Sequence, residues 1–354
     1  MAEERSPLDR LKARLQEGAK ETGGSPWAGE STELTEALAE LKRKNQALKR
    51  ARRRIAEKDH ELDVLRASLA EQHNDQAEGI RPENMVWIFG AGRTGSSWLA
   101  AMIEEIKGQT VWFEPRIGEV FNTSRFERYR GRNFILSAHY RKTWLQSIRN
   151  FVLDGANARF PKAAGPDSYL MIKDPAGSVG APLLMEVFSE SRMVLLVRDP
   201  RDVAASWLDA NKKGGWQNER RKKDRRRQET QADTNPDAHV KRHAEAYLRN
   251  VGNAKEALDS HEGHKVLVRY EDLRADTLSE MKRLYFTLEI PVDEKELTSA
   301  VEKHTWENIP EKKKGEGKFY RKATPGGWQE DLTPKQAQIV ERITASLLNE
   351  LYPS

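Results

Sequence analysis

The sequence predicts an α/β protein in which a parallel sheet with flanking helices follows a long helix. The first observation is a series of five short apolar runs separated by segments of helical periodicity. The runs cover residues 85–89, 111–113, 168–172, 193–197 and 265–268. Strands that alternate with helices form parallel sheets, which bind ligands at the carboxyl ends of the strands. The second observation is an unbroken heptad repeat of apolar residues ahead of the first run.

Composition limits the classes of protein and site to consider. The chain has 354 residues, of which 37% are hydrophobic and 32% charged, with a formal net charge of +5. It contains no cysteine, which excludes disulfides, thiol catalysis and thiolate metal ligands. No apolar run approaches the ~18 residues of a membrane-spanning helix, and the first residues lack an apolar signal region. We therefore expect a cytoplasmic protein without a membrane span, and the charge favours an anionic ligand.

The N-terminal part of the chain changes character at residue 30. Residues 1–29 contain Gly, Ser and Pro with few apolar residues, so we expect a flexible tail. Residues 30–74 carry one apolar residue at every seventh position: Leu34, Leu41, Leu48, Ile55, Leu62 and Leu69. This repeat predicts a coiled coil, most simply a homodimer. Asn45 and Arg52 occupy positions of the second seam that should be apolar, so a single helix lying against its own domain stays an alternative.

A linker is expected at residues 75–84. Gly79 favours the end of a helix, and Pro82 cannot continue one. The remaining residues, 85–354, have the length of one α/β domain. We expect this domain to carry the ligand site.

The stretch MVWIFGAGRTGSSWLAAMI, residues 85–103, indicates a strand, a glycine-rich turn and a helix. Gly92 and Gly95 allow the backbone to approach a ligand closely, and the free N–H groups of the following helix attract anions. Hydroxyl side chains in the same turn are Thr94, Ser96 and Ser97. The Gly-Lys-Ser/Thr of a nucleotide-binding P-loop is missing, and Arg93 supplies the positive charge. Taken alone, the stretch also fits a tight strand–helix turn with an exposed arginine.

Two further stretches supply cations to the same edge of the predicted sheet. In RMVLLVRDPRDVAASWLDA, residues 192–210, a buried strand ends at Arg198, and Ser206 follows about two helical turns later. This spacing allows the guanidinium and the hydroxyl to converge on one phosphate. In GKFYRKATPGGWQEDLT, residues 317–333, a loop containing Gly and Pro carries Arg321 and Lys322.

Together these stretches resemble the motifs of the sulfotransferases that use 3′-phosphoadenosine 5′-phosphosulfate (PAPS), over roughly residues 84–345. The first is similar to the family's 5′-phosphosulfate loop, Pro-Lys/Arg-Ser-Gly-Thr-Thr-Trp-Leu. The second is similar to its 3′-phosphate motif, and the third to Arg-Lys-Gly-x-x-Gly-Asp-Trp, which closes over the 3′-phosphate. LVRYEDL, residues 267–273, is similar to the family's Tyr-Glu-Asp-Leu strand. The resemblance implies a P-loop-like sulfotransferase fold.

The resemblance also implies PAPS as the co-substrate, two separated anion sites and no metal. The residues implied at the 5′ end are Gly92, Arg93, Thr94, Gly95, Ser96 and Ser97. Those implied at the 3′-phosphate are Arg198, Ser206, Arg321 and Lys322. Trp98, Tyr270 and Trp306 would border the adenine, although plain core packing is an alternative for Trp98.

The reaction implied is in-line transfer of a sulfuryl group to an acceptor hydroxyl, dominated by positioning and charge stabilisation. Arg93 stands where the family places a lysine or arginine near the bridging oxygen, and Lys173 resembles the lysine near the sulfuryl group. Many members have a base histidine in Lys-x-His, whereas this chain has Lys173-Asp174-Pro175. Glu114, in VWFEPRIGEVF, resembles a Glu-Pro stretch of carbohydrate sulfotransferases and is our leading candidate for the base, with Asp174 second.

The acceptor is expected to be a carbohydrate hydroxyl. The basic segment KKGGWQNERRKKDRRR, residues 212–227, is either a solvated loop or a landing site for an anionic glycan. Nucleic-acid binding is not expected, because no recognised reader fold accompanies these charges. Further candidates for the acceptor cleft are Arg116, His139, Arg141, Trp144 and Trp216. Two other functions stay open: a non-enzymatic coiled-coil assembly protein with a degenerate nucleotide-binding domain, and a P-loop nucleotide kinase.

Overall fold

A computed structural model describes residues 39–58, 61, 79–122, 134–223 and 235–352, without the side chains of residues 221–223. The chain divides into two compact units, Met1–Ala77 and Glu78–Ser354. The expected tail at residues 1–29 and residues 75–78 of the expected linker at residues 75–84 lie outside the described residues.

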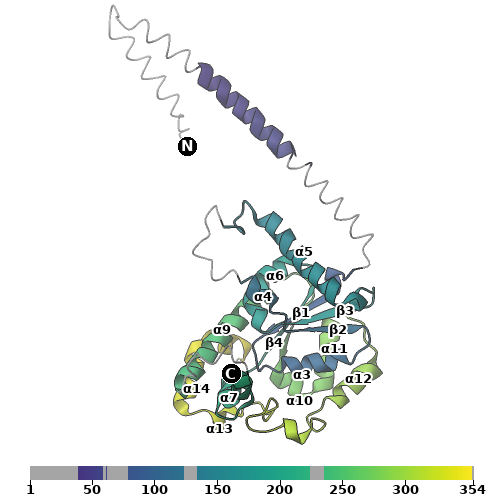
Figure 1. Ribbon diagram of the computed structural model, residues 1–354, viewed down its shortest axis with the longest axis vertical. Helices are drawn as coiled ribbons and strands as arrows, with labels where there is room; N and C mark the ends of the chain where they lie inside the picture. The colour runs from purple at the N-terminus through teal and green to yellow at the C-terminus, as the bar shows by residue number, and fades with distance from the viewer. Residues whose placement is uncertain (1–38, 59–60, 62–78, 123–133, 224–234, 353–354) are drawn as a thin grey trace, which may run out of the picture. The chain divides into compact units, whose positions relative to one another are not determined.

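In the first unit, residues 39–58 form a helix (Figure 1). Three residues of the heptad repeat lie in it, and all are exposed: Leu41 at 49%, Leu48 at 51% and Ile55 at 60%. Ion pairs one helical turn apart, Lys44 with Glu40 and Arg53 with Glu57, favour the helix. The other repeat residues, Leu34, Leu62 and Leu69, lie outside the described residues.

The second unit contains a five-stranded parallel sheet. Its strands are β1 (Met85–Gly90), β2 (Gln109–Phe113), β3 (Tyr169–Lys173), β4 (Arg192–Val197) and β5 (Lys265–Arg269). They lie in the order β2-β3-β1-β4-β5, and every neighbouring pair is parallel. The α/β class and the parallel sheet predicted from the sequence are therefore confirmed, and each predicted apolar run overlaps a strand.

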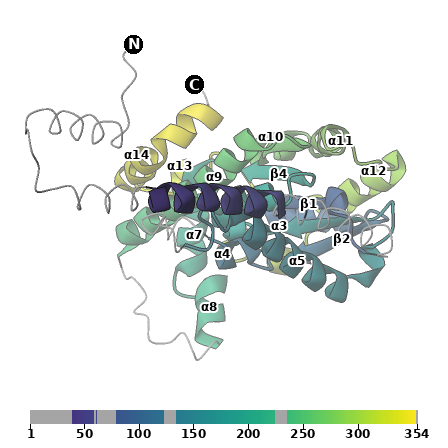
Figure 2. The same cartoon turned by 90° about the horizontal axis from the view of Figure 1, so that it is seen from above.

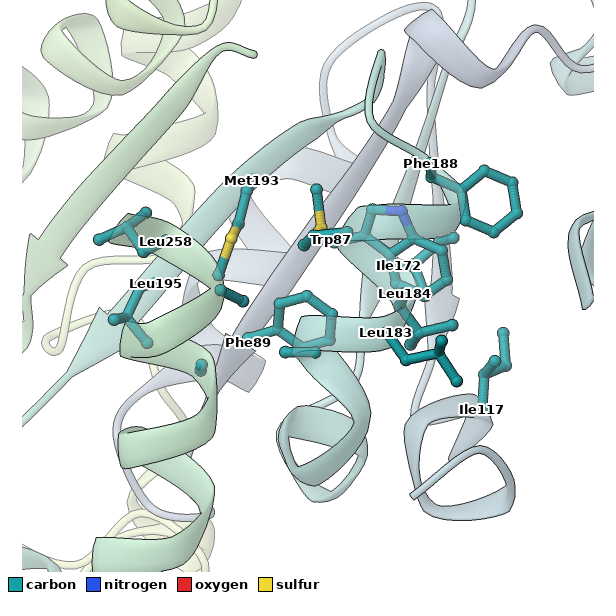
Figure 3. Packing of buried hydrophobic residues seen from close by; sticks show 14 of the residues in the cluster. Trp87, Phe89, Ile117, Ile172, Leu183, Leu184, Phe188, Met193, Leu195 and Leu258 are labelled. Atoms are coloured by element: carbon teal, nitrogen blue, oxygen red, sulfur yellow. The ribbon is translucent and has the colours of Figure 1, made fainter. Parts of the chain in front are cut away.

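The central strands are buried on both faces because helices cover each side of the sheet. Every residue of β1 and β3 is buried, as expected for strands inside a parallel sheet. The side chains of β1 alternate, with Trp87 and Phe89 entering one apolar cluster and Val86 and Ile88 entering the other. Figure 3 shows part of the first cluster, in which Trp87 and Phe89 pack with residues of β3, β4 and the covering helices.

The helices form two layers, one on each side of the sheet in Figure 1, and Figure 2 shows the same elements from above. On the Trp87 face the clustered residues come from α5 (Arg141–Arg159), α6 (Ala181–Val187), α9 (Pro236–Ser260) and α14 (Pro334–Leu351). On the Val86 face they come from α3 (Ser96–Glu104), α10 (Tyr270–Ala275), α11 (Thr277–Thr287) and α12 (Glu294–Lys303). The other helices of this unit are α4 (Ile117–Val120), α7 (Pro200–Asn211), α8 (Trp216–Lys223) and α13 (Trp328–Asp331).

Four 3₁₀ helices complete the described elements: η1 (Pro82–Asn84), η3 (Pro161–Ala163), η4 (Ala176–Gly180) and η6 (Glu311–Lys313). Helices α7, α9 and α14 begin where the sequence provides a capping side chain followed by proline. Asp199 caps α7 and Asn235 caps α9 through backbone N–H groups, and a proline follows each cap. Thr333 forms a capping box with Gln336 at the start of α14. The helix that follows β4 therefore begins directly after Arg198, which fixes that arginine at the strand end.

Candidate functional site

A cavity of about 690 Å³ lies at the carboxyl edge of the sheet, where all five strands end. Residues at or just beyond the strand ends line it, including Ala91, Glu114, Lys173, Arg198 and Tyr270. Residues of α7, α8 and α9 and of the loop before α13 complete its wall. This is the position that the parallel-sheet prediction gives for a ligand.

The glycine-rich turn forms the floor of the cavity. Gly95 has φ +90° and precedes α3, and its carbonyl accepts the N–H groups of Trp98 and Leu99. A Cβ on Gly95 would lie 2.6 Å from Cδ2 of Tyr270, so both the backbone and the packing require glycine. Thr94 is fully buried, and its hydroxyl donates to the carbonyl of Ala91 at 2.8 Å. Thr94 thus stabilises the turn and does not line the cavity, unlike the other implied loop residues.

The guanidinium of Arg93 makes contacts that the sequence did not predict. Its Nε donates to Oγ of Ser206 at 2.9 Å, and Nη2 donates to the carbonyl of Phe319 at 2.6 Å. Its guanidinium therefore contacts a residue that the resemblance assigns to the 3′-phosphate, although Arg93 itself was assigned to the 5′ end. Burial, followed by the charges of Arg198 and Arg321, lowers the pKa of Arg93 to about 10.

Arg198 lies at the end of β4 against Tyr270, with Cζ 4.4 Å from the centre of the ring. Its Nη1 donates to the carbonyl of Arg93 at 3.3 Å, and Nη2 lies 3.7 Å from Oδ2 of Asp202. Its Nε is buried and has no hydrogen-bond partner among the described residues. The hydroxyl of Tyr247 donates to the carbonyl of Arg198 at 2.8 Å, which holds the backbone in place. Arg198 therefore has donor capacity left for an anion in the cavity.

The stretch that carries Arg321 and Lys322 is anchored to α7 by acidic residues that the sequence analysis missed. Buried Asp202 accepts the backbone N–H groups of Gly326 at 2.8 Å and Trp328 at 2.9 Å. Asp209, two turns later on the same helix, accepts the N–H of Gly317 at 2.8 Å. An aspartate at each end of an otherwise apolar helical stripe was the available signal. These bonds bring residues 317–328 against the cavity from far along the sequence.

The anchored loop places both of its cations in the cavity wall. Nη1 of Arg321 lies 2.5 Å from Oδ2 of Asp331, and Nζ of Lys322 lies 2.9 Å from Glu330 and 3.0 Å from Asp331. All four residues that the resemblance assigns to the 3′-phosphate, Arg198, Ser206, Arg321 and Lys322, thus line one cavity.

Lys173 and Glu114 form an ion pair in the cavity wall. The Lys173 side chain is 1% exposed, and its ammonium contacts the Glu114 carboxylate, Oγ of Ser97 at 3.2 Å and the face of Phe113 at 3.8 Å. Burial lowers the pKa of Lys173, and the contact with Glu114 opposes this change. The Glu114 side chain is 47% exposed and lines the cavity, so it is accessible to a substrate.

Asp174, the second candidate for the base, does not line the cavity. It is fully buried, and its Oδ1 accepts the backbone N–H groups of Arg116 at 3.2 Å and Gly177 at 3.1 Å. Burial raises the pKa of Asp174, and these N–H groups oppose the increase. Its position behind the wall separates it from any substrate in the cavity.

The three aromatic residues implied at the adenine all line the cavity: Trp98, Tyr270 and Trp306. The indole N–H of Trp98 donates to the carbonyl of His304 at 2.8 Å, and its ring meets that of Tyr270 edge-on with centres 6.3 Å apart. Trp98 also packs against the apolar cluster of the Val86 face. Core packing and contact with the cavity are thus combined in one side chain.

The candidates for the acceptor cleft fall into two groups, those that line the cavity and those that do not. Arg116 and Trp216 line the cavity, whereas His139, Arg141 and Trp144 do not. Arg141 instead pairs with Glu186 on α6. The basic segment contributes Trp216 and two residues beside it, Gln217 and Arg220, through α8; residues 224–227 lie outside the described residues. Helix α9 adds residues that the sequence analysis missed, namely His243, Ala246, Tyr247 and Asn250, whose spacing marks one helix face.

The cavity wall is strongly cationic. Among the residues that the structure describes, one carboxylate, Glu114, lines it together with eight cationic side chains: Arg93, Arg116, Lys173, Arg198, Arg220, Arg274, Arg321 and Lys322. Within the described ranges no group of acidic or histidine side chains is arranged to hold a metal ion. No helix in the described part of the chain is long and apolar enough to cross a membrane. The arrangement suits a ligand with several negative charges.

Comparison with known proteins yields one family. Residues 83–351 match the sulfotransferase domain family, and no curated protein matches the chain. Similar solved structures include mouse sulfotransferase SULT7A1 complexed with PAP, with 14% identity, coverage of 75% of this chain and 85% of that chain, and a TM-score of 0.47. Another is the sulfotransferase domain from the curacin biosynthetic pathway, with 15% identity, coverage of 75% and 97%, and a TM-score of 0.44. Sulfotransferase STF9 from Mycobacterium avium has 14% identity, coverage of 79% and 80%, and a TM-score of 0.44.

The geometry of the turn predicts the effect of Gly95→Ala. The added Cβ would meet Tyr270 at 2.6 Å and strain a residue with φ +90°, so the turn and the tyrosine must move apart. We expect the affinity for adenosine 3′,5′-bisphosphate (PAP), measured by calorimetry, to fall by about tenfold or more, since overpacking costs about 1–3 kcal/mol. The control is Gly214→Ala, because Gly214 has φ +84° but no atom within 4 Å of the added Cβ. Equal losses in both variants, or none in Gly95→Ala, would contradict the role given to Gly95.

Proposed function

The chain belongs to the sulfotransferase domain family, and from this premise we propose that it transfers a sulfuryl group from PAPS to a hydroxyl of a carbohydrate. The observation that carries the proposal is a cluster of arginine side chains at Ser206. Arg93 donates a hydrogen bond to Ser206, and Arg198 and Arg321 lie close enough for their charges to act on Arg93. Lys173 lines the same cavity. PAPS carries a 3′-phosphate and a 5′-phosphosulfate. A donor with two anionic groups matches a cavity lined by several cations.

For the donor, we assign the 3′-phosphate to Arg198, Ser206, Arg321 and Lys322, which share the cavity wall. The 5′-phosphosulfate is assigned to the start of α3, where Ser96 and Ser97 present hydroxyls beside free backbone N–H groups. Lys173 contacts Ser97 and therefore reaches this end of the donor. The adenine is assigned to the surface formed by Trp98, Tyr270 and Trp306.

Arg93 is assigned an electrostatic role. It belongs to the turn that would hold the 5′ end, while its guanidinium contacts Ser206 at the 3′-phosphate site, so its charge acts between the two anion sites. A pKa of about 10 keeps it protonated at neutral pH. It therefore stabilises negative charge on the leaving phosphate and does not donate a proton.

In the proposed reaction the acceptor oxygen forms a bond to sulfur as the bond between sulfur and the bridging phosphate oxygen breaks. The products are a sulfate ester and PAP. The proton of the acceptor hydroxyl passes to Glu114, which lines the cavity beside Lys173, and later to water. The ammonium of Lys173 stabilises charge on the transferred group, as positioned cations do in phosphoryl transfer.

The carbohydrate acceptor rests on two features. The Glu-Pro stretch at Glu114 resembles that of carbohydrate sulfotransferases. Arg116 and Arg220 line the cavity, and their side chains are suited to a polar or anionic glycan. The function is tested by incubating the protein with labelled PAPS and a panel of glycans, peptides and small alcohols.

The expected result of this assay is label on a glycan. Label on peptides or small alcohols only would contradict the carbohydrate acceptor. Binding of PAP without label on any acceptor would contradict the enzymatic function and favour a degenerate binding domain in an assembly protein.

The role of Glu114 predicts the effect of Glu114→Gln. Loss of the proton acceptor should lower kcat by roughly 10²–10⁴-fold, the usual contribution of general-base catalysis. The affinity for PAP should stay within about threefold, or about 0.7 kcal/mol, because Glu114 does not belong to either anion site. Glu119→Gln is the matched control, since Glu119 pairs with Arg116 but does not line the cavity. A wild-type rate for Glu114→Gln would exclude Glu114 as the base.

We also propose that residues 30–74 form a coiled coil that joins two copies of the chain, ahead of the linker at residues 75–84 and the domain at residues 85–354. The support is the exposure of Leu41, Leu48 and Ile55 at heptad spacing on a helix rich in charged residues.

This proposal predicts a dimer by light scattering at micromolar concentration. Leu48→Glu should give a monomer because it places a charge in the apolar seam, whereas Gln46→Glu, two positions away and outside the seam, should not. A wild-type monomer, or a Leu48→Glu dimer, would contradict the coiled coil.

A further inference from the structure

The turn between β2 and α4 is strained at two of its three residues. Glu114 has φ +48° and Arg116 has φ +61°, which lie in the left-handed region that side chains with a Cβ rarely adopt. Such residues are strained and persist only where the surroundings hold them. Since Glu114 carries the proposed base, the contacts that hold this turn decide where that carboxylate lies.

Asp174 supplies the contact that holds the turn. Its Oδ1 accepts the N–H of Arg116 at 3.2 Å and the N–H of Gly177 at 3.1 Å, so one oxygen joins the turn to η4. Asp174 is itself fixed to the sheet, because its own N–H donates to the carbonyl of Ile88 on β1 at 3.0 Å. The N–H of Glu114 donates to the carbonyl of Lys173 at 2.8 Å. The turn is therefore bound on both sides of Pro115.

Close backbone packing leaves the turn little room to relax. A Cβ on Gly118 of α4 would lie 1.7 Å from the carbonyl oxygen of Gly177, and a Cβ on Gly180 would lie 2.3 Å from the carbonyl oxygen of Gly118. A Cβ on Gly177 would lie 2.0 Å from Oδ2 of Asp174. The backbones of α4 and η4 thus touch around the Asp174 carboxylate, which has no space to turn away.

We propose that Asp174 is a positioning residue, which holds the turn at residues 114–116 so that the Glu114 carboxylate meets the Lys173 ammonium inside the cavity. The proposal rests on the proposed function, because it gives Glu114 its place in the reaction. The proposal gives Glu114 and Asp174 different roles. Glu114 faces the substrate, and Asp174 acts through Glu114 from behind the cavity wall.

The test compares Asp174→Ala with Asp174→Asn. Alanine removes the acceptor of both N–H groups, whereas the amide oxygen of asparagine can accept both, since the two bonds share Oδ1. We expect Asp174→Ala to lower kcat by tenfold or more, with PAP affinity within about threefold of wild type. Asp174→Asn should keep kcat within about threefold of wild type. The control is Asp167→Ala, which changes an exposed aspartate just before β3, the strand that Asp174 follows, and it should match wild type.

A double variant shows whether Asp174 acts through Glu114. If it does, adding Asp174→Ala to Glu114→Gln lowers kcat no further than Glu114→Gln alone. Additive losses would overturn the proposal, as would wild-type kcat in Asp174→Ala. An inactive Asp174→Asn that still binds PAP would also overturn it, and this outcome can be read even if Asp174→Ala does not fold.

A crystal structure of Asp174→Ala, or of Asp174→Asn if the alanine variant does not fold, gives a readout that needs no turnover. The alanine variant should show the turn relaxed and the Glu114 carboxylate away from Lys173, and the asparagine variant should show both in place. An unchanged turn in the alanine variant, or a displaced one in the asparagine variant, would overturn the positioning role. A wild-type rate for Glu114→Gln would instead contradict the proposed function, so the two failures are distinguishable.

Discussion

Repulsion among cationic side chains at the carboxyl edge of the sheet is the constraint on which the rest of the site depends. Partial burial lowers the pKa of Arg93, and the charges of nearby Arg198 and Arg321 lower it further. A single carboxylate shares the cavity wall in the described part of the chain. Parallel strands create this crowding because they bring all their carboxyl ends to one edge. An anionic ligand relieves the repulsion, which makes the cavity suited to a highly charged donor.

Buried and half-buried carboxylates hold this crowded edge together by accepting backbone N–H groups. Asp202 fixes the loop that carries Arg321, Asp174 fixes the turn that carries Glu114, and Glu271 accepts the N–H of Asp199 at 2.9 Å beside Arg198. Burial raises the pKa of all three acids. Since each folded pKa lies above its unfolded value, these three groups favour the folded state less as the pH rises through that interval.

The sheet and the cations were predictable from local patterns, whereas their mutual contacts were not. Apolar runs in the sequence indicate the strands, and the glycine-rich turn indicates the carboxyl edge of the sheet as the ligand site. The order of the motifs along the chain predicts that Arg198 and Arg321 lie at this edge. The direction of Arg93 depends on Ser206 and on the carbonyl of Phe319, which are distant in sequence. The inward hydroxyl of Thr94 likewise depends on how the turn closes. Periodic patterns in the sequence carry no information about such tertiary contacts.

The central claim is that the cavity binds a nucleotide with anionic groups at both its 5′ and 3′ ends. Isothermal titration of the full chain with PAP, adenosine 5′-monophosphate and ATP at one salt concentration tests it directly. We expect PAP to bind about tenfold or more tightly than either competitor, because only PAP offers a 3′-phosphate to Arg198, Arg321 and Lys322. Equal affinity for PAP and adenosine 5′-monophosphate, or tighter binding of ATP, would contradict the account.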